Sequence, residues 1–325
     1  MPQGELAQVL QRIAPAASSD ALLAGPNGFD DSGAVRLGNG RVGLHTVDFF
    51  PPVVDDPAAY GEIAAANALS DIYACGGEPK VVLNIAGFPE EWGKEIVLPI
   101  VDAAVAKVAE SGAIWAGGHT VRSKEPLFGF AVFGEVAEDA LVTNAGARPG
   151  DLLFLTKPLG CGPLNTAVKR GSADPGHVAA ACAGMARLNA AAGAALLASG
   201  SKAATDVTGF GLMGHAANLA KASDVGLDIK AVALPLYEGA AELAAADVFS
   251  GSSMRGRQTL EGIVEISSSV PSWLASLCFD AETSGGILAC VPGNGRSAFE
   301  AAFPEDCPPV FVGEVVEGLP CVRLG

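Results

Sequence analysis

The sequence predicts an α/β chain with two domains, spanning residues 1–145 and 146–325. Strand-like segments rich in Val, Leu and Phe alternate with alanine-rich helical segments along the whole chain. A turn-rich stretch, residues 137–150, interrupts this alternation near the middle. With 325 residues and 50% hydrophobic side chains, the chain is long enough to form two cores.

The first domain is expected to contain three helices and three strands, with a further strand-like segment, AIWA, before residue 117. The strand segments carry alternating polar and apolar side chains, or compact runs of β-branched and aromatic residues. The central helix has Pro57 in its first turn and Gly76-Gly77 after its end, which are typical start and stop signals. In chain order the elements are helix 4–13, strand 41–48, helix 57–74, strand 81–88, helix 95–111 and strand 127–136.

The second domain begins with the apolar segment DLLFLTKPLG, which predicts a strand followed by a glycine loop. The alanine-rich residues 177–199 then predict one long helix. Because Arg187 and Asn189 interrupt its apolar run, we interpret it as an internal helix and not as a membrane span. Further along, we expect a helix over residues 215–222 and a strand over residues 227–234.

The charge of the chain narrows the classes of partner. The formal net charge is −16, so there is no surplus of basic side chains to bind nucleic acid or an anionic membrane. An anionic substrate would therefore need a metal ion to approach. The first residues show no basic region followed by an apolar core, so we expect no signal peptide and a cytoplasmic location.

The seven cysteines form no CxxC pair, and their number is odd. Both facts argue against a disulfide framework or a zinc cluster. Most of these cysteines are expected to be small packing residues. Cys161, within the glycine-rich segment TKPLGCG, is the thiol that this explanation fits least well.

Five aspartates stand among small and apolar neighbours: Asp30, Asp31, Asp48, Asp71 and Asp206. Asp48 is expected near the end of its strand, and Asp71 shares one helix face with Asn67. Each aspartate alone could be a helix cap or a turn former. Together they indicate a cation site, because carboxylates held close together repel one another strongly. Mg²⁺ carrying a polyphosphate fits these oxygen ligands best.

Two glycine-rich motifs are candidates for loops that bind the phosphate groups of a nucleotide. GGHT, residues 117–120, is predicted to turn its backbone N–H groups inward as an anion-binding nest, or to form a plain tight turn. His119 lies inside this motif, and Thr120 adds a hydroxyl group. The chain contains no GxxxxGK[ST] sequence, so it has no Walker A loop.

GFGLMG, residues 209–214, matches the GxGxxG fingerprint of dinucleotide-binding folds. The segment before it is too polar for a buried parallel strand, and Asp228 lies at the wrong end of the next strand. We therefore interpret the motif as a flexible turn that leads into a helix and presents Asp206 to the metal. His215 is expected to be a hydrogen-bonded structural histidine.

Motifs in the same order along nearly the whole chain resemble those of selenophosphate synthetase (selenide, water dikinase). They are DDSGAV, TVDFFPPVVDDPAAYGEIAAANALSDIYACGGEPKVVLNIAGFP, AGGHT with EPLFGFAVFGEV, FLTKPLGCGPL, ATDVTGFGLMGH and ETSGGILACV. The resemblance implies a fold shared with aminoimidazole ribonucleotide synthetase, in which the N-terminal domains form a barrel across a homodimer. It also implies ATP-dependent conversion of selenide to selenophosphate, with release of AMP and orthophosphate.

The same resemblance assigns roles to individual residues. Asp31, Asp71 and Asp206 match the magnesium ligands of the family. Residues matching its nucleotide-binding positions are Gly28, Phe29, Asp30, Asp48 and Asp71. Gly118, His119 and Thr120 match residues that contact the nucleotide of the partner subunit.

One family feature has no counterpart. The family carries a loop with a catalytic cysteine or selenocysteine, and a lysine three residues on, just before the helix that begins here near Gly4. This chain starts at Met1, and its first cysteine and first lysine are Cys75 and Lys80. No catalytic residue is therefore assigned, and we expect a truncated chain or part of a longer polypeptide, some relatives having a fused flavin oxidoreductase upstream. We also expect Mg-ATP binding with little or no selenophosphate synthesis.

Three alternatives stay open. The chain could be a paralogue that binds or hydrolyses ATP without making selenophosphate. It could be another ATP-using member of the superfamily, such as a thiamine-phosphate kinase or a hydrogenase-maturation protein. It could also be a non-catalytic nucleotide-binding dimer that regulates a partner.

Overall fold

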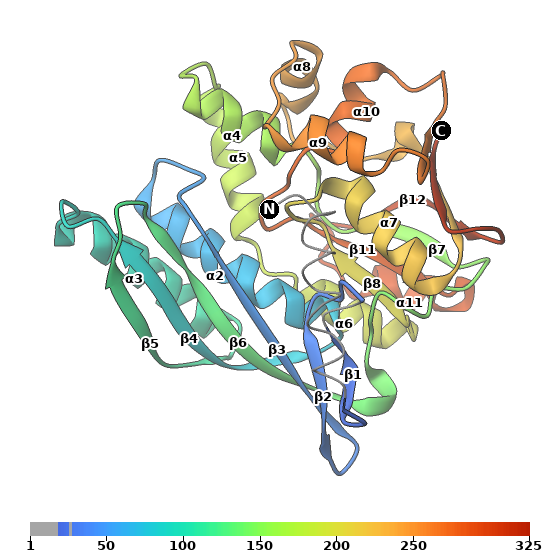
Figure 1. Ribbon diagram of the computed structural model, residues 1–325, viewed down its shortest axis with the longest axis horizontal. Coiled ribbons are helices and arrows are strands. Elements are labelled where there is room, and N and C mark those ends of the chain that lie inside the picture. Colours follow the sequence, from blue (N-terminus) through green and yellow to red (C-terminus); the bar gives the residue numbers. More distant parts are fainter. Residues whose placement is uncertain (1–18, 26–27) are drawn as a thin grey trace.

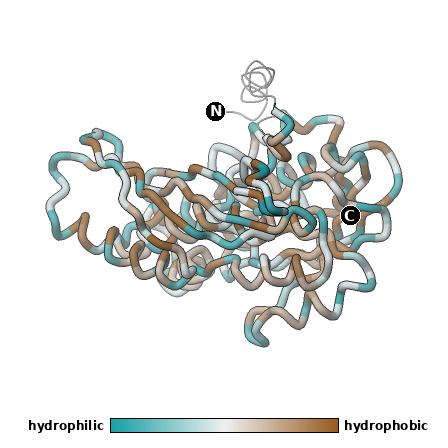
Figure 2. The backbone as a smooth tube through the Cα atoms, turned by 90° about the horizontal axis from the view of Figure 1, so that it is seen from below, coloured by the Kyte–Doolittle hydropathy of each residue, from teal (hydrophilic) through white to brown (hydrophobic). Residues whose placement is uncertain are grey.

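The computed structural model describes residues 19–25 and 28–325. Two mixed β-sheets, one in each half of the chain, pack against helices and meet along one long helix (Figure 1). Figure 2 shows brown and pale apolar segments along the strands and helices, with teal polar segments mainly on the outer loops. The expected helix 4–13 lies outside the described residues.

The first half forms a six-stranded sheet in the order β1-β2-β3-β6-β4-β5. Among the strand pairs that the described residues form in this sheet, β4–β5 alone is parallel. Two helices, α2 and α3, lie against one face of this sheet (Figure 1). The elements are β1 (Leu22–Ala24), β2 (Gly33–Gly38), β3 (Arg41–Phe50), α2 (Pro57–Ala74), β4 (Glu78–Phe88), α3 (Lys94–Glu110), β5 (Ile114–Arg122) and β6 (Leu127–Ala137).

Helix α2 lies at the centre of the molecule and matches its predicted bounds. Pro57 occupies its first turn, and the Asp56 side chain accepts a hydrogen bond from the Ala59 N–H at 2.7 Å. Most of its residues are buried, because the sheet and α3 cover one side while α5, α6 and β8 cover the other. Gly76, with φ +68°, ends the helix in the left-handed conformation that glycine tolerates best.

The second half forms a seven-stranded sheet in the order β10-β13-β9-β12-β7-β11-β8. Its strands are β7 (Leu152–Leu155), β8 (Ala203–Asp206), β9 (Gly226–Ile229), β10 (Val264–Ile266), β11 (Ile287–Val291), β12 (Val310–Val316) and β13 (Cys321–Leu324). Its helices are α4 (Cys161–Lys169), α5 (Pro175–Ala186), α6 (Ala190–Ser199), α7 (Gly211–Ser223), α8 (Ala240–Ala245), α9 (Ser252–Thr259), α10 (Ser272–Cys278) and α11 (Arg296–Ala301). Between the two sheets, residues 138–151 contain a 3-10 helix, Glu138–Ala140, and an isolated β-bridge from Thr143 to Ala203.

Two predicted elements of the second half are wrong in length. The single helix over 177–199 is two helices, α5 and α6, bent by 52°. Arg187 is extended at the break (ψ 129°), and the Asn189 side chain donates to the Ser70 hydroxyl and the Gly285 carbonyl. The strand over 227–234 ends at Ile229 and continues as a 3-10 turn.

Within the described part of the chain, no single helix is both long enough and apolar enough to cross a membrane. Only the bent pair α5 and α6 meets the length and composition requirement, and then only when the two are taken together.

Candidate functional site

Four of the five aspartates singled out in the sequence converge where the two halves of the molecule meet. Asp31 lies in the loop before β2, Asp48 near the end of β3, Asp71 on α2 and Asp206 at the end of β8. Their charges act on one another, since Asp206 raises the pKa values of the other three carboxyl groups. Carboxylates from both halves of the chain therefore share one site.

The first half of the chain fixes two of these carboxylates with side chains that its periodicity places correctly. Thr46 stands two residues before Asp48, on the same face of β3, and its hydroxyl donates to Asp71 Oδ2. Asn67 stands one helical turn before Asp71, and its Nδ2 donates to Asp48 Oδ2 at 2.6 Å. A side chain of β3 thus holds the Asp71 carboxylate of α2, and a side chain of α2 holds the Asp48 carboxylate of β3.

The second half supplies Asp206 and the contacts to Asp31. Thr205 Oγ1 lies 2.9 Å from Asp31 Oδ1 and 3.3 Å from His215 Nδ1. One potential ligand atom each from Asp31, Asp206 and His215 lies within 4.8 Å of the others. Asp206 is 2% exposed, and its Oδ2 has no hydrogen-bond partner among the described residues. A buried carboxylate oxygen without a donor is the kind of atom that a cation would satisfy.

Burial raises the pKa values of all four carboxyl groups. It brings Asp206 to about 6, and together with the Asp206 charge it brings Asp48 to about 7. For Asp31 and Asp71, burial is again the largest cause and neighbouring carboxylates add to it. The protein alone disfavours a fully ionised cluster, and a divalent cation would compensate the repulsion between its carboxylates. Because the donors are carboxylate oxygens, Mg²⁺ fits the site.

Asp30 makes a different contact from its neighbour Asp31. Its Oδ1 accepts a hydrogen bond from the Asn144 N–H at 2.7 Å, and Asn144 Nδ2 donates to the Phe29 carbonyl at 2.6 Å. Phe29 has φ +52°, an uncommon value for a residue with a side chain, and Gly28 precedes it. One oxygen of Asp30 thus ties the loop of the first half to the segment between the sheets.

The GGHT motif is neither a nest nor a tight turn, because its residues lie inside strand β5. Gly118 pairs with Asn84 and His119 with Ile85 of the parallel strand β4. A Cβ on Gly118 would lie 2.1 Å from Asn84 Oδ1, so the close strand pairing requires glycine at this position. The three residues Gly118, His119 and Thr120 are exposed on the edge strand.

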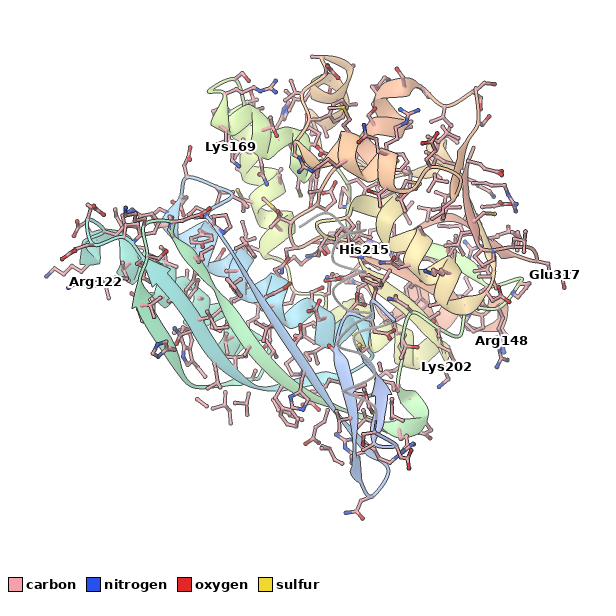
Figure 3. All side chains as sticks on the ribbon, in the orientation of Figure 1. Arg122, Arg148, Lys169, Lys202, His215 and Glu317 are labelled. Atoms are coloured by element: carbon pink, nitrogen blue, oxygen red, sulfur yellow. The ribbon has the colours of Figure 1, made fainter. Side chains whose placement is uncertain are left out.

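Strand β5 lies away from the carboxylates of the same chain. In Figure 3, Arg122 at the end of β5 lies at the left margin, whereas His215 lies near the middle. Strands β6 and β4 separate β5 from β3 and its Asp48.

The GFGLMG motif leads into helix α7, which begins at Gly211, four residues before the predicted start. Gly211 has φ +67°, and a Cβ there would lie 2.5 Å from the Asp280 carbonyl. His215 lies on this helix and is hydrogen bonded, as the sequence predicted. The motif therefore acts as the turn that joins Asp206 to α7.

A buried layer behind the carboxylates was not assigned from the sequence. Lys157 is buried, and its Nζ donates to the Arg187 carbonyl at 2.7 Å and the Ser284 carbonyl at 2.8 Å. Burial lowers the Lys157 pKa to about 7, while Asp206 acts in the opposite direction. The Ser284 N–H donates to Asn67 Oδ1 at 3.0 Å. The TKPLG and ETSGG segments held a signal for this layer, since each places polar side chains directly beside an apolar strand, TKPLG after β7 and ETSGG before β11.

The thiols nearest to these groups are buried. Cys161 begins α4, and the Glu282 carboxylate accepts hydrogen bonds from the Gly160 and Cys161 N–H groups at 2.7 and 3.0 Å. Burial, with the Glu282 charge, raises the Cys161 pKa well above its usual value. Burial likewise raises the pKa of Cys75, whose neighbours include Asp31. Neither thiol is poised as a thiolate nucleophile.

Two family models match the chain in succession. Residues 29–136 match the N-terminal domain of AIR synthase related proteins, and residues 148–320 match the C-terminal domain of the same proteins. The order of the two matches follows the two sheets of the structure.

Curated relatives and solved structures agree with these matches. A selenide, water dikinase of Nitratidesulfovibrio vulgaris strain DP4 is 40% identical over 301 residues, covering 92% of this chain and 86% of the relative. A selenide, water dikinase of Myxococcus xanthus is 40% identical over 324 residues, covering 98% and 92%. A solved structure described as AaThiL complexed with AMPPCP and TMP superposes with a TM-score of 0.71 at 20% identity, covering 100% of this chain and 95% of that one.

Proposed function

This chain belongs to the selenide, water dikinase family of AIR synthase related proteins, and from this premise we propose that it makes selenophosphate from selenide, ATP and water. In the proposed reaction, selenide takes the γ-phosphoryl group of ATP, and water then cleaves the remaining ADP to AMP and orthophosphate. The observation that carries the proposal is the cluster of four carboxylates at the junction of the two halves, with Asp71 and Asp206 buried and Asp31 and Asp48 partly buried.

In this proposal Asp31, Asp71 and Asp206 hold Mg²⁺. Asp206 Oδ2, buried and without a partner among the described residues, supports this assignment. Mg²⁺, when bound, would neutralise negative charge on the triphosphate, which is a main requirement of phosphoryl transfer. Asp48, oriented by Asn67, would contact the nucleotide together with residues 28–30.

We further propose a homodimer in which Gly118, His119 and Thr120 reach the nucleotide of the partner subunit. Their exposure on an edge strand, remote from the carboxylates of the same chain, supports this arrangement. The face of the first sheet turned away from α2 exposes Val47, Leu83 and other apolar side chains. A cavity of about 320 Å³ on this face is lined by residues of β3, β4 and β6. Such a surface suits a second copy of the chain.

Nucleotide binding and turnover should be measured separately. Titration calorimetry with Mg-ATP is expected to show binding to the wild-type chain and none to the Asp71→Asn variant. Anaerobic ³¹P NMR with ATP, Mg²⁺ and selenide then detects selenophosphate, AMP and orthophosphate directly. Absence of Mg-ATP binding to the folded wild-type chain would contradict the proposal.

A second candidate function is Mg-ATP binding without selenophosphate synthesis. The state of the thiols favours it, because Cys75 and Cys161 are both buried with raised pKa values. The same two measurements separate the candidates. Mg-ATP binding without selenide-dependent AMP formation supports the second function, whereas robust selenide-dependent AMP formation excludes it.

A further inference from the structure

The side chains behind Asp31 form a chain of hydrogen bonds whose direction the structure defines. His215 Nε2 lies 3.1 Å from the backbone nitrogen of Thr208. A backbone N–H can only donate, so Nε2 must carry a lone pair and act as the acceptor. The Thr208 hydroxyl, 3.3 Å from the same ring nitrogen, fits the same polarity. Neutral His215 therefore carries its proton on Nδ1.

The proton on Nδ1 decides the role of Thr205. Thr205 Oγ1 lies 3.3 Å from His215 Nδ1, so it accepts that hydrogen bond and keeps its own proton for another partner. Two acceptors are in reach, namely Asp31 Oδ1 at 2.9 Å and the Asp206 carbonyl at 3.2 Å. The carboxylate is nearer, and a charge-assisted bond is the stronger one. Thr205 thus donates to Oδ1 of Asp31.

The direction of these hydrogen bonds also excludes His215 as a direct ligand of a cation bound by Asp31 and Asp206. Its ring lies close enough to Asp31 and Asp206 for a metal site by distance alone. Yet Nε2 accepts from Thr208 and Nδ1 faces Thr205, so neither nitrogen is free to bind a cation. The ring is also buried, and it packs against Phe210 with centroids 5.7 Å apart.

We propose that His215 and Thr205 are positioning residues that orient Asp31 through the relay Thr208 N–H to His215 to Thr205 to Asp31. The relay binds Oδ1 of Asp31 and leaves Oδ2 for the cation. It rests on the proposed function only in naming that cation as Mg²⁺. Outer partners of this kind typically change metal affinity by about 10- to 100-fold when they are removed.

The first test reads the tautomer in the metal-free protein and needs no activity. The chain has four histidines, so selective ¹⁵N labelling gives a small set of ring signals, and the spectrum of His215→Asn identifies those of His215. Long-range ¹H–¹⁵N correlation is expected to show the Nδ1–H tautomer. The Nε2–H tautomer, or a doubly protonated ring at neutral pH, would overturn the relay.

The second test compares variants that keep different parts of the ring. Asn at position 215 places an amide N–H where Nδ1 stands, whereas Gln places its amide near Nε2. The relay predicts that His215→Asn retains Mn²⁺ affinity, measured by titration calorimetry, better than His215→Gln. An anchoring role for the Thr208 loop alone predicts the reverse order, and that order would overturn the proposal.

Two substitutions of Thr205 test the relay without changing the imidazole ring of His215. Thr205→Val removes the hydroxyl and is expected to weaken Mn²⁺ binding by about 10- to 100-fold. Thr205→Ser keeps the hydroxyl and should bind close to wild type. His177→Asn is the matched control, because His177 is partly exposed and lies against Glu238, at 3.7 Å. Equal Mn²⁺ affinity of the folded Val and Ser variants would refute the relay. If the wild type binds no divalent cation, the proposed function fails, while the tautomer measurement still decides the relay.

Discussion

At the scale of the residue, Asp206 is the clearest place where the proposed metal site would lower the stability of the metal-free protein. Its carboxyl group is buried, and one oxygen lacks a partner among the described residues. Asn is nearly the same size and cannot ionise. We expect Asp206→Asn to stabilise the metal-free protein by about 1 to 3 kcal/mol, the size implied by a carboxyl pKa displaced from 3.8 to about 6. The same change should abolish the stabilisation that Mg²⁺ gives to the wild type.

Urea unfolding with and without Mg²⁺ measures both effects. Asp102→Asn is the control, because Asp102 is exposed on α3 and should change neither quantity. A metal-free Asp206→Asn protein less stable than wild type would show that Asp206 is satisfied within the protein and has no need of a cation.

The carboxyl groups also predict how stability depends on pH. Asp48 has a pKa raised to about 7 and Asp206 to about 6, both above the value of 3.8 expected in the unfolded chain. Between pH 3.8 and about 7, these two carboxyl groups bind more protons in the folded state than in the unfolded state. The unfolding free energy therefore falls as the pH rises through this range. We expect the metal-free protein to lose stability between pH 4 and about 7 relative to a variant with Asn at both positions.

The comparison with that variant removes the contribution of titrating groups that do not interact with Asp48 or Asp206. Asp31 and Asp71 add to the difference in the same direction, because these neighbouring charges raise their pKa values. Unfolding free energies across this range, at fixed ionic strength without divalent cations, provide the measurement. Parallel curves for the two proteins would contradict the prediction. Saturating Mg²⁺ should reduce the loss of stability that the wild type shows as the pH rises, because cation binding favours the ionised carboxylates.

At the scale of the element, the sequence predicts what local signals control. Helix α2 has its bounds as expected, because Pro57 and Gly76 act within the chain segment itself. The break between α5 and α6 was not predictable in this way, since Asn189 bonds to Ser70 and Gly285, both remote in sequence. The same holds for GGHT, whose glycines suggest a turn until strand β4 is placed beside them.

The contact between α2 and α3 depends on one glycine that local signals do not explain. A Cβ on Gly61 would lie 2.0 Å from the Ile100 carbonyl oxygen, and a backbone group of a helix cannot move aside at low cost. We expect Gly61→Ala to lower the unfolding free energy by about 1 to 3 kcal/mol, although alanine is the better helix former. Gly293→Ala is the control, because an added Cβ there meets nothing within 4 Å. Equal stabilities of the two variants in urea would show that the helices separate without cost.

At the scale of the whole molecule, the site depends on two halves that fold around different sheets. The aspartate motifs predicted one site built from both halves, and the structure brings Asp31, Asp48, Asp71 and Asp206 together, while their roles remain the proposal made above. Sequence patterns could not supply the relay behind Asp31 or the place of Lys157. Both follow from contacts between residues far apart in the chain.

The proposed dimer gives the last prediction, because it divides the nucleotide site between two chains. Asp71 belongs to one subunit's site, whereas His119 would serve the partner's site. When pure, Asp71→Asn should bind no Mg-ATP, and His119→Ala should bind it more weakly than the wild type. After mixing and subunit exchange, the His119→Ala chain in a mixed dimer keeps its own Asp71 and gains an intact His119 from its partner. Titration calorimetry should therefore show Mg-ATP binding restored in a share of the sites.

The matched control is a mixture of Asp71→Asn and Asp206→Asn chains, in which every site lacks a metal ligand and no binding should return. Native mass spectrometry with one tagged chain establishes that exchange has occurred. Exchange without restored binding would place His119 outside the nucleotide site, and a monomeric wild type would remove the dimer itself. Restoration in the first mixture alone requires that β5 of one subunit completes the site of the other, because no rearrangement within a single chain could give that pattern.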